Sequence, residues 1–332
     1  MNNPLHHLPK VELHRHLEGS IPVPLTLEWS KKYKLPLPSE NPAEEIQVKT
    51  PLPFSQVLER LFYQQRCFQN LESVETLTYE VLKSIALDNI KLIEIRFSPS
   101  FMAEPQNLSF DSIMEATLSA KEKAEKDFDI DVGYLLISSR DYGVEACEET
   151  VDLALRWRKE IVGIDLAGDE THFPPELFEK PFQRAHKAGL SITTHSGEVS
   201  APSHITTSIE KLKAKRIGHG VQDIQDPKVI QHLIKKNIPL ELCPTSNFIT
   251  QAIPHIKDHP IKKLMQAGIA VTINSDDPTL FGTTLTQEYE ICMNDLDMTL
   301  QDIKKTIITS LKHSFLSEEK KKQAWEKHFR FL

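Results

Sequence analysis

The sequence has few cysteines, and they are not arranged as in a disulfide framework or a thiolate metal site. Its 332 residues include four cysteines, which are far apart and form no Cys-x-x-Cys pair. Ligands for any metal must therefore be sought among histidines and carboxylates. Long apolar runs are also missing, and residues 1–8 lack the apolar stretch of a signal peptide. We therefore expect no membrane span and a cytoplasmic location.

The sequence also has no excess of positive charge. The formal net charge is −8, the isoelectric point is about 6.0, and no basic patch with interleaved aromatic residues occurs. These features argue against a nucleic acid as the main partner. With 39% hydrophobic and 26% charged residues, a chain of this length can bury a sizeable core without covalent staples. No break in composition suggests a second domain, so residues 1–332 are predicted to form one domain.

Short apolar segments alternate with helical patterns along most of the chain. The strand candidates are residues 11–19, 91–98, 130–137, 161–168, 190–197, 216–220, 238–244 and 269–276. Strands that alternate with helices favour a parallel sheet, and eight such units at this length favour a (β/α)₈ TIM barrel. Extra helices are expected in residues 20–90, after the first strand, and in residues 285–332. The charge run at 318–322 is typical of a solvated helix face.

Residues 54–68 have apolar side chains at helical spacing. Val57, Leu61, Phe62 and Phe68 recur with a period close to one helical turn. The common interpretation of such a face is a helix packed on the core. A second interpretation is an apolar lid over the site that follows the first strand. The sequence leaves both open.

Polar side chains that bind metals or move protons gather at the ends of the strand candidates. In chain order they are His14, His16, Asp169, Glu170, His195, Glu198, His219, Glu241, Asp276 and Asp277. Active sites of barrels lie at the carboxyl ends of the strands. His14 and His16 are two residues apart, so they project to one side of their strand, close enough to share a metal ion. If that strand continues, Glu18 lies on the same side.

Each of these residues alone has a purely structural explanation. A His-x-His pair can be two unrelated histidines, His195 can be a hydrogen-bonded core residue, and Asp276 with Asp277 can cap a helix. The occurrence of all of them at the same ends of the strands is harder to explain by structural roles alone. His14, His16, His195 and Asp276 end three different strands and offer three nitrogens and one oxygen, a set suited to zinc.

A zinc site at this place would serve hydrolysis. Zinc lowers the pKa of bound water to about 7, and the reaction then needs a base beside the water and an acid beside the leaving group. His219 and Glu198 are the candidates, since they lie on or beside the same strands. No lysine ends the fourth strand to bridge two metals. We therefore predict one zinc ion per chain.

Six motifs in order resemble those of the adenosine deaminase family, within the metal-dependent amidohydrolase barrels. They are residues 10–19 (KVELHRHLEG), 164–171 (IDLAGDET), 194–199 (THSGEV), 216–220 (RIGHG), 241–247 (ELCPTSN) and 272–278 (TINSDDP). Their spacing is similar to that of the family from about residue 8 to the C-terminal helices. Six ordered motifs make a specific match.

The resemblance implies a role for each site residue. The implied zinc ligands are His14, His16, His195 and Asp276. His219 would orient and deprotonate the metal-bound water, and Glu198 would protonate ring N1 as hydroxide attacks C6. Asp277 would pair with N7, and the Gly168 N–H with N3. The implied substrate-binding residues are His16, Glu18, Gly168 and Asp277.

The chain departs from the family pattern at two positions. Glu18 stands where adenosine deaminases usually have Asp, the residue that reaches the ribose 5′-hydroxyl, and Glu is familiar there from relatives that act on adenine or other 6-aminopurine nucleosides. An extra methylene changes what the carboxylate can hydrogen-bond. Ser196 replaces a more usual Ala, with little effect expected. Residues 98–99, 197–199 and 314–316 follow the adenosine deaminases.

The predicted function is zinc-dependent deamination of adenosine and 2′-deoxyadenosine to the 6-oxopurine and ammonia, in purine salvage. One alternative is deamination of adenine or of another 6-aminopurine nucleoside, such as a 5′-modified adenosine. Another is a catalytically silent purine-binding barrel, against which the complete set of ligands and proton-transfer residues speaks. The expected partner is a small purine nucleoside, with no nucleic acid and no membrane. The sequence leaves the oligomeric state open.

Overall fold

The computed structural model describes residues 4–37, 41–222 and 226–332, and in them eight parallel strands form a barrel. The strands are β1 (Lys10–His16), β2 (Ile90–Phe97), β3 (Asp131–Ser139), β4 (Gly163–Ala167), β5 (Ser191–Ser196), β6 (Arg216–His219), β7 (Leu240–Leu242) and β8 (Val271–Ile273). Each strand pairs in parallel with the next one along the chain. The predicted (β/α)₈ architecture is confirmed.

The barrel closes between the first strand and the segment that follows the last one. The His16 N–H donates to the Asp276 carbonyl at 2.9 Å, and the Asp276 N–H donates to the His14 carbonyl at 3.1 Å. Nearer the middle of the barrel, the Asn274 side-chain oxygen accepts the His14 N–H at 3.2 Å. The seam therefore joins the two stretches of chain that carry three of the four predicted metal ligands.

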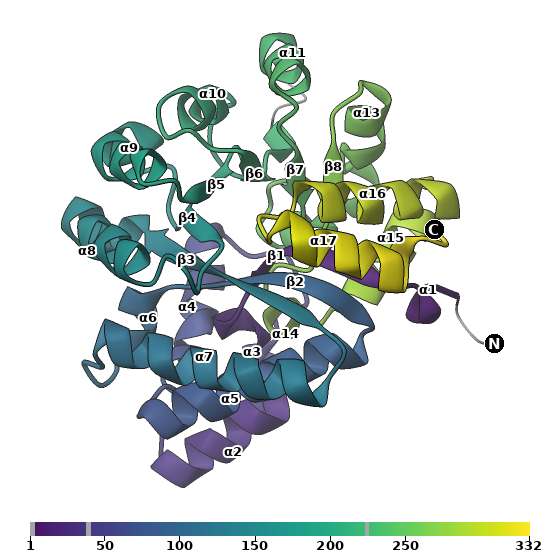
Figure 1. Cartoon of the computed structure of the whole chain (residues 1–332). Coiled ribbons are helices and arrows are strands. Elements are labelled where there is room, and N and C mark those ends of the chain that lie inside the picture. The colour runs from purple at the N-terminus through teal and green to yellow at the C-terminus, as the bar shows by residue number, and fades with distance from the viewer. Residues whose placement is uncertain (1–3, 38–40, 223–225) are drawn as a thin grey trace.

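An outer ring of helices covers the strands (Figure 1). After β2 to β7 they are α6 (Pro99–Ala103), α7 (Phe110–Asp127), α8 (Gly143–Arg156), α9 (Glu179–Lys187), α10 (Ser203–Glu210), α11 (Pro227–Lys236), α12 (Pro244–Ile249) and α13 (Ile261–Gln266). Because helices cover the sheet outside and side chains fill it inside, the strands are buried on both faces, and their buried side chains include charged ones such as Arg96 and Glu241. No helix among the described residues is long and apolar enough to cross a membrane.

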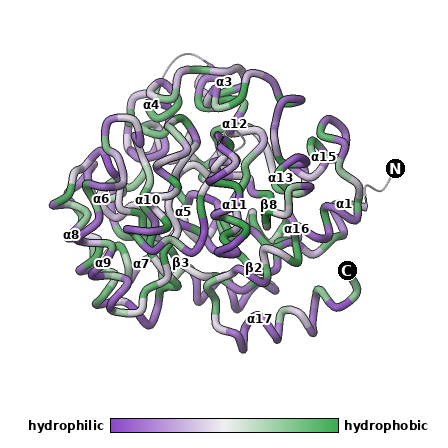
Figure 2. The backbone as a smooth tube through the Cα atoms, turned by 90° about the horizontal axis from the view of Figure 1, so that it is seen from above, coloured by the Kyte–Doolittle hydropathy of each residue, from purple (hydrophilic) through white to green (hydrophobic). Residues whose placement is uncertain are grey.

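Additional helices follow β1 and β8, as predicted. After β1 come the 3₁₀ turn η1 (Glu18–Ser20), α2 (Val23–Tyr33), α3 (Pro42–Ile46), α4 (Phe54–Gln65) and α5 (Leu71–Leu87). After β8 come α14 (Pro278–Phe281), α15 (Leu285–Asp295), α16 (Leu300–His313), α17 (Glu318–Ala324) and a π-helical turn (Trp325–Phe329), while α1 (Pro4–His7) precedes β1. Figure 2 shows α3, α4 and α12 at one end of the molecule and the largely hydrophilic α17 at the other.

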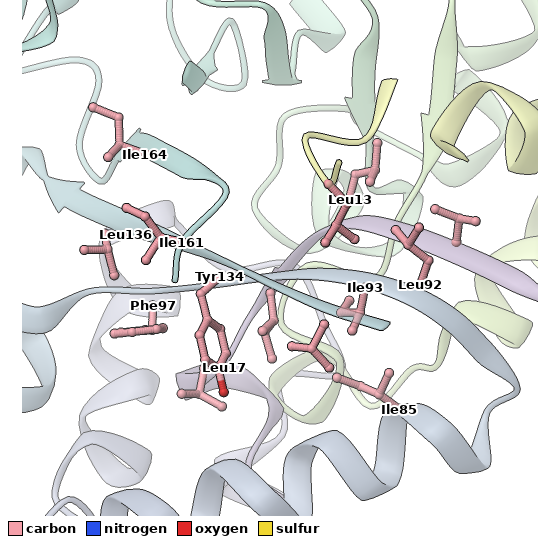
Figure 3. Close-up of a cluster of buried hydrophobic side chains, with 14 of the residues drawn as sticks. Leu13, Leu17, Ile85, Leu92, Ile93, Phe97, Tyr134, Leu136, Ile161 and Ile164 are labelled. Atoms are coloured by element: carbon pink, nitrogen blue, oxygen red, sulfur yellow. The ribbon is translucent and has the colours of Figure 1, made fainter. Parts of the chain in front are cut away.

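The main core lies between the strands and the surrounding helices. Figure 3 shows Ile85 of α5 near Ile93, and Phe97, Tyr134 and Leu136 from the two neighbouring strands β2 and β3. All five of these side chains are buried. This packing fixes the positions of the strand ends, because a shift along any strand would expose apolar surface or open a void.

The first strand is shorter than the sequence predicts. It ends at His16, and Glu18 lies in the 3₁₀ turn η1. The idea that Glu18 shares a strand face with His14 and His16 is therefore wrong. The Leu17 N–H still donates to the Arg96 carbonyl of β2 at 2.8 Å. From Glu18 onward the chain leaves the sheet and forms the turn. This turn sets where the Glu18 carboxylate lies.

Candidate active site

The four predicted metal ligands meet at the carboxyl end of the barrel. His14, His16, His195 and Asp276 each offer one ligand atom, and these atoms all lie within 4.8 Å of one another. His14 Nε2 and His16 Nε2 lie 3.1 and 3.2 Å from Asp276 Oδ1, and His16 Nε2 lies 3.2 Å from His195 Nε2. Three side chains are buried, and His16 is partly exposed. The atoms surround one point, as ligands of a single ion do.

Carboxylates hydrogen-bonded to the Nδ1 atoms of His14 and His195 make the ligand group suited to a cation. His14 Nδ1 lies 2.9 Å from Glu241 Oε2, and His195 Nδ1 lies 3.1 Å from Asp165 Oδ2. An ionised carboxylate only accepts, so each Nδ1 carries a proton, and in the neutral ring, the form that binds a metal, Nε2 then has a lone pair. His14 Nε2 thus faces Asp276 Oδ1, lone pair toward lone pair, and both atoms are buried without a hydrogen-bond partner among the described residues. A zinc ion would turn this repulsion into coordination.

One arginine holds the two carboxylates that support these histidines. Arg96 donates to Asp165 at 2.7 Å and to Glu241 at 2.8 Å, and Arg216 donates to the other oxygen of Glu241 at 2.5 Å. Burial raises the pKa of Glu241, but the charges of Arg96 and Arg216 outweigh it and hold that pKa well below its usual range. Both carboxylates stay ionised, which secures the histidine tautomers. Among these supporting residues, the sequence analysis singled out only Glu241.

His219 and Glu198 stand beside the ligand group. His219 Nε2 lies 3.5 Å from Glu198 Oε2 and 3.9 Å from Asp276 Oδ2. Burial, together with the negative charges of Asp276 and Glu170, raises the pKa of Glu198 well above its usual range. The shift favours the protonated carboxyl, which is the form that a general acid requires. The Thr250 hydroxyl, which the sequence analysis did not identify, donates to Glu198 Oε1 at 3.0 Å.

Glu170 builds the loop that carries Glu198. Its carboxylate accepts four consecutive backbone N–H groups, from residues 197 to 200, at distances between 2.7 and 3.1 Å. A loop whose amides converge on one buried carboxylate has little freedom to move. Glu170, which the sequence places at the end of the fourth strand, is thus a support for the acid.

The backbone is strained at two of the site residues. His219 has φ of +63° and Asp276 has φ of +61°, in the left-handed region that side chains with a Cβ seldom occupy. Such conformations cost free energy and persist where the surrounding structure fixes them, commonly at functional sites. Gly218, next to His219, has no room for a side chain, because a Cβ there would lie 2.8 Å from His14 Cε1.

A second group of metal-binding side chains overlaps the first. His219, Cys243 and Asp276 also lie within ligand distance of one another. Burial and the negative charges of Asp276 and Glu288 raise the pKa of the Cys243 thiol well above its usual range. A protonated thiol is a poor ligand, so the group of three histidines and one aspartate is the better metal site.

A cavity of about 340 Å³ opens from the ligand group. Gly168, Asp277 and Glu18, the predicted substrate contacts, all line it. Gly168 has φ of +100°, and a Cβ there would lie 2.0 Å from Asp141 Oδ2. The position therefore needs glycine, and its backbone can border a ligand closely. All the predicted catalytic, metal-binding and substrate-binding residues line this cavity except His14, which lies beside it in the ligand group.

Glu18 lines this cavity, and only one of its two carboxylate oxygens has a hydrogen-bond partner among the described residues. Its Oε1 accepts the Ser98 N–H at 2.7 Å, while Oε2 is buried without a hydrogen-bond partner among the described residues. Burial raises the pKa of Glu18 to about 7, although the Ser98 N–H and His16 oppose the shift. One carboxylate oxygen is therefore held by the residue that follows β2, and the other is available to a ligand.

The apolar face of α4 lines the cavity. Phe54, Leu58, Leu61 and Phe62 all border it, together with Phe101 of α6. Val57 and Leu61 also pack in a small apolar cluster with Ile249, Leu280 and Phe281, separate from the main core. Phe68, by contrast, belongs to the main core. Both interpretations of residues 54–68 hold in part: α4 covers the cavity, and the segment after it packs on the core.

Two further carboxylates and a tyrosine line the cavity. Glu104 and Asp141 line it with Tyr142, and the Tyr142 hydroxyl donates to Glu104 Oε2 at 2.5 Å. None of the described residues that line the cavity is a lysine or an arginine. Sequence reasoning missed these residues, since they follow strands whose ends carry no metal ligand. The cavity therefore favours neutral or cationic ligands over anions.

A parallel barrel with these ligands, this acid and this cavity at its carboxyl end defines a metal-dependent hydrolase of the amidohydrolase class. The chain belongs to the adenosine deaminase family, whose model matches residues 9–328.

Individual relatives differ in their named substrates. The chain is 36% identical to an adenosine deaminase of Clostridium acetobutylicum, over 94% of each protein. Among solved structures it resembles an adenine deaminase from Arthrobacter aurescens, with 26% identity, a TM-score of 0.91 and coverage of 98% of this chain and 99% of that one. It also resembles an N6-methyl-AMP deaminase from Arabidopsis thaliana, with 28% identity, a TM-score of 0.86 and coverage of 98% and 96%.

Proposed function

We propose that the protein is a zinc-dependent deaminase that converts adenosine and 2′-deoxyadenosine to their 6-oxopurine nucleosides and ammonia. The observation that carries this proposal is the group formed by His14, His16, His195 and Asp276, with the buried Glu198, whose pKa is raised, beside it. Three nitrogens and one carboxylate oxygen suit one zinc ion per chain. The whole chain, residues 1–332, would act as one catalytic domain in purine salvage in the cytoplasm.

The site residues would divide the work as follows. Zinc, when bound, lowers the pKa of water to about 7 and so supplies a nucleophile. Addition of hydroxide at C6 would break the aromaticity of the ring while Glu198 gives its proton to N1, which prevents negative charge from building on the purine. The hydroxyl proton of the tetrahedral adduct then passes to the 6-amino group, which leaves as ammonia, and the proton lost by the water restores Glu198. His219 orients the attacking oxygen. Asp277 would hold N7 and the Gly168 N–H would hold N3, so that C6 faces the ligand group.

The cavity supports a nucleoside as substrate rather than a nucleotide. A phosphate group would enter a cavity whose lining carries Glu18, Glu104 and Asp141, with no lysine or arginine among the described lining residues. The sugar hydroxyls of adenosine, by contrast, can donate to these carboxylates. The relationship to the adenosine deaminase of Clostridium acetobutylicum supports the same substrate.

Adenine and 5′-modified adenosines are the second candidates. Glu18 stands at the position where a shorter Asp is usual in adenosine deaminases, and the structural relative from Arthrobacter aurescens is an adenine deaminase. A catalytically silent barrel is the third candidate. It is disfavoured because the metal-ligand group is present together with Glu198, a buried carboxyl whose pKa is raised.

A parallel assay tests the proposal. The zinc-loaded protein is given adenosine, 2′-deoxyadenosine, adenine, AMP and a 5′-alkylthio-5′-deoxyadenosine, and the loss of the 6-amino chromophore is followed. We expect the highest kcat/KM for adenosine and 2′-deoxyadenosine and the lowest for AMP. A higher kcat/KM for adenine would establish the second candidate, and no turnover of any compound would establish the third.

A further inference from the structure

A row of buried side chains leads from the α13 N-terminus to His219. His259, which precedes α13, places Nε2 3.2 Å from Asn247 Oδ1, and Asn247 of α12 places Nδ2 3.0 Å from His219 Nδ1. At most 5% of each residue is exposed. None of the three is a member of the ligand group of three histidines and one aspartate. The row reaches His219 on the side of the ring opposite to Glu198.

The direction of these hydrogen bonds is set by the backbone. The Ile261 N–H donates to His259 Nδ1 at 3.2 Å. A backbone amide can only donate, so His259 Nδ1 must accept, and the neutral ring carries its proton on Nε2. This N–H donates to Asn247 Oδ1, which turns the Asn247 NH₂ group toward His219. Asn247 then donates to His219 Nδ1, so neutral His219 carries its proton on Nε2.

The reverse arrangement would bring donors face to face. If Asn247 were flipped, its NH₂ group would meet the N–H of His259 Nε2. Moving the His259 proton to Nδ1 would relieve that contact but would set Nδ1–H against the Ile261 N–H. A doubly protonated His259 would also set Nδ1–H against the Ile261 N–H. Burial disfavours that form, since it lowers the pKa of this ring to about 3. One orientation satisfies all three hydrogen bonds.

We infer that His259, acting through Asn247, is a positioning residue that holds His219 in the tautomer with its proton on Nε2. His219 Nε2 lies on the Glu198 side of the ring, 3.5 Å from the carboxyl. His219 therefore presents an N–H, not a lone pair, to the place where the proposed function puts the attacking water. It orients the water by donating to its oxygen, and in this tautomer it does not act as the base that the sequence resemblance implies. This catalytic meaning rests on the proposed function, whereas the tautomer does not.

The tautomer can be observed directly. The full-length protein is labelled with ¹⁵N-histidine, its zinc content is measured, and ¹⁵N shifts are recorded, because they distinguish protonated from unprotonated ring nitrogens. The His219→Gln variant identifies the signals of His219. We expect an unprotonated Nδ1 and a protonated Nε2 at neutral pH. A protonated Nδ1 on His219 would overturn the inference whether or not the protein deaminates purines.

Two substitutions of His259 test its influence. His259→Gln places an amide NH₂ near the lost Nε2–H and should keep both the tautomer and kcat within about three-fold. His259→Leu removes the donor and frees Asn247 to flip, so kcat should fall about 10- to 100-fold, the usual effect of an outer hydrogen-bond partner, with KM nearly unchanged. An unchanged kcat and spectrum in a folded His259→Leu protein would refute the positioning role. If that variant does not fold, the spectra of wild type and His259→Gln decide.

Discussion

His14 Nε2 lies 3.1 Å from Asp276 Oδ1, and neither atom has a hydrogen-bond partner among the described residues. Two buried lone pairs at this distance repel unless a cation lies between them. We therefore predict about one equivalent of zinc per chain, measured by elemental analysis after gentle purification. Removal of the metal by a chelator should abolish turnover and lower Tm, since a ligand that binds only the folded state stabilises it.

The metal prediction has a matched pair of variants. Asp276→Asn keeps the shape of the side chain but removes the ligand charge, and it should reduce zinc content to a small fraction of one equivalent. Asp295→Asn makes the same change on the exposed surface of α15 and should keep the full content. Equal zinc in both variants would show that the metal is held elsewhere.

Glu198→Gln should lower kcat about 10²- to 10⁴-fold while zinc remains bound, because the change removes the proton for N1 without touching a ligand. Glu115→Gln on the exposed face of α7 is the control. Burial and the charges of Asp276 and Glu170 raise the pKa of Glu198. Turnover should therefore fall as the pH rises through that pKa. Retained turnover in Glu198→Gln would assign the acid to another residue.

The metal ligands at the ends of the strands were easier to predict from the sequence than the residues that support them. His14, His16, His195 and Asp276 are polar side chains at the ends of apolar strands, and their spacing reveals them. Arg96, by contrast, lies 69 positions from Asp165 and 145 from Glu241. No local pattern connects residues so far apart in sequence. Their contact arises only when the barrel closes, so their supporting role needed the structure.

The position of Glu18 illustrates a second limit. The alternation of a strand predicts its face only while the strand lasts, and β1 ends at His16. The carboxylate still reaches the cavity, but it does so from a turn and with one oxygen held by the Ser98 N–H. Such a turn depends on how the chain passes to the helices that follow, which periodicity does not encode.

Glu18→Ala should raise KM for adenosine more than KM for adenine, because the free Oε2 is placed to accept a hydrogen bond from a sugar hydroxyl. Loss of one hydrogen bond to a charged acceptor is worth about 1.5–3 kcal/mol, or roughly a 10- to 150-fold change. Glu28→Ala, on the exposed surface of α2, should change neither value. Equal rises for the two substrates would show that Glu18 contacts the base or supports the loop at Ser98.

Leu61→Ala should raise KM for adenosine about ten-fold, equivalent to ~1.4 kcal/mol, and leave kcat nearly unchanged. Leu61 lines the cavity from α4 and contributes apolar surface that a bound nucleoside would cover. Glu59→Ala lies on the exposed side of the same helix and provides the control. A fall in kcat with unchanged KM would mean that α4 shapes the catalytic group instead of covering the substrate.

Arg96→Met should both destabilise the protein and weaken zinc binding. The guanidinium is fully buried between Asp165 and Glu241, and its removal leaves two carboxylates with less compensation, at a cost of about 3–5 kcal/mol in the free energy of unfolding. Because those carboxylates hold the tautomers of His195 and His14, zinc affinity should fall about 10- to 100-fold. Arg156→Met removes the exposed ion pair with Asp111, which is worth at most ~1 kcal/mol. Urea unfolding and competition with a chelator measure the two effects. If the Arg96 variant were no worse than the Arg156 variant in either measurement, the buried arginine would be a packing element without influence on the metal site.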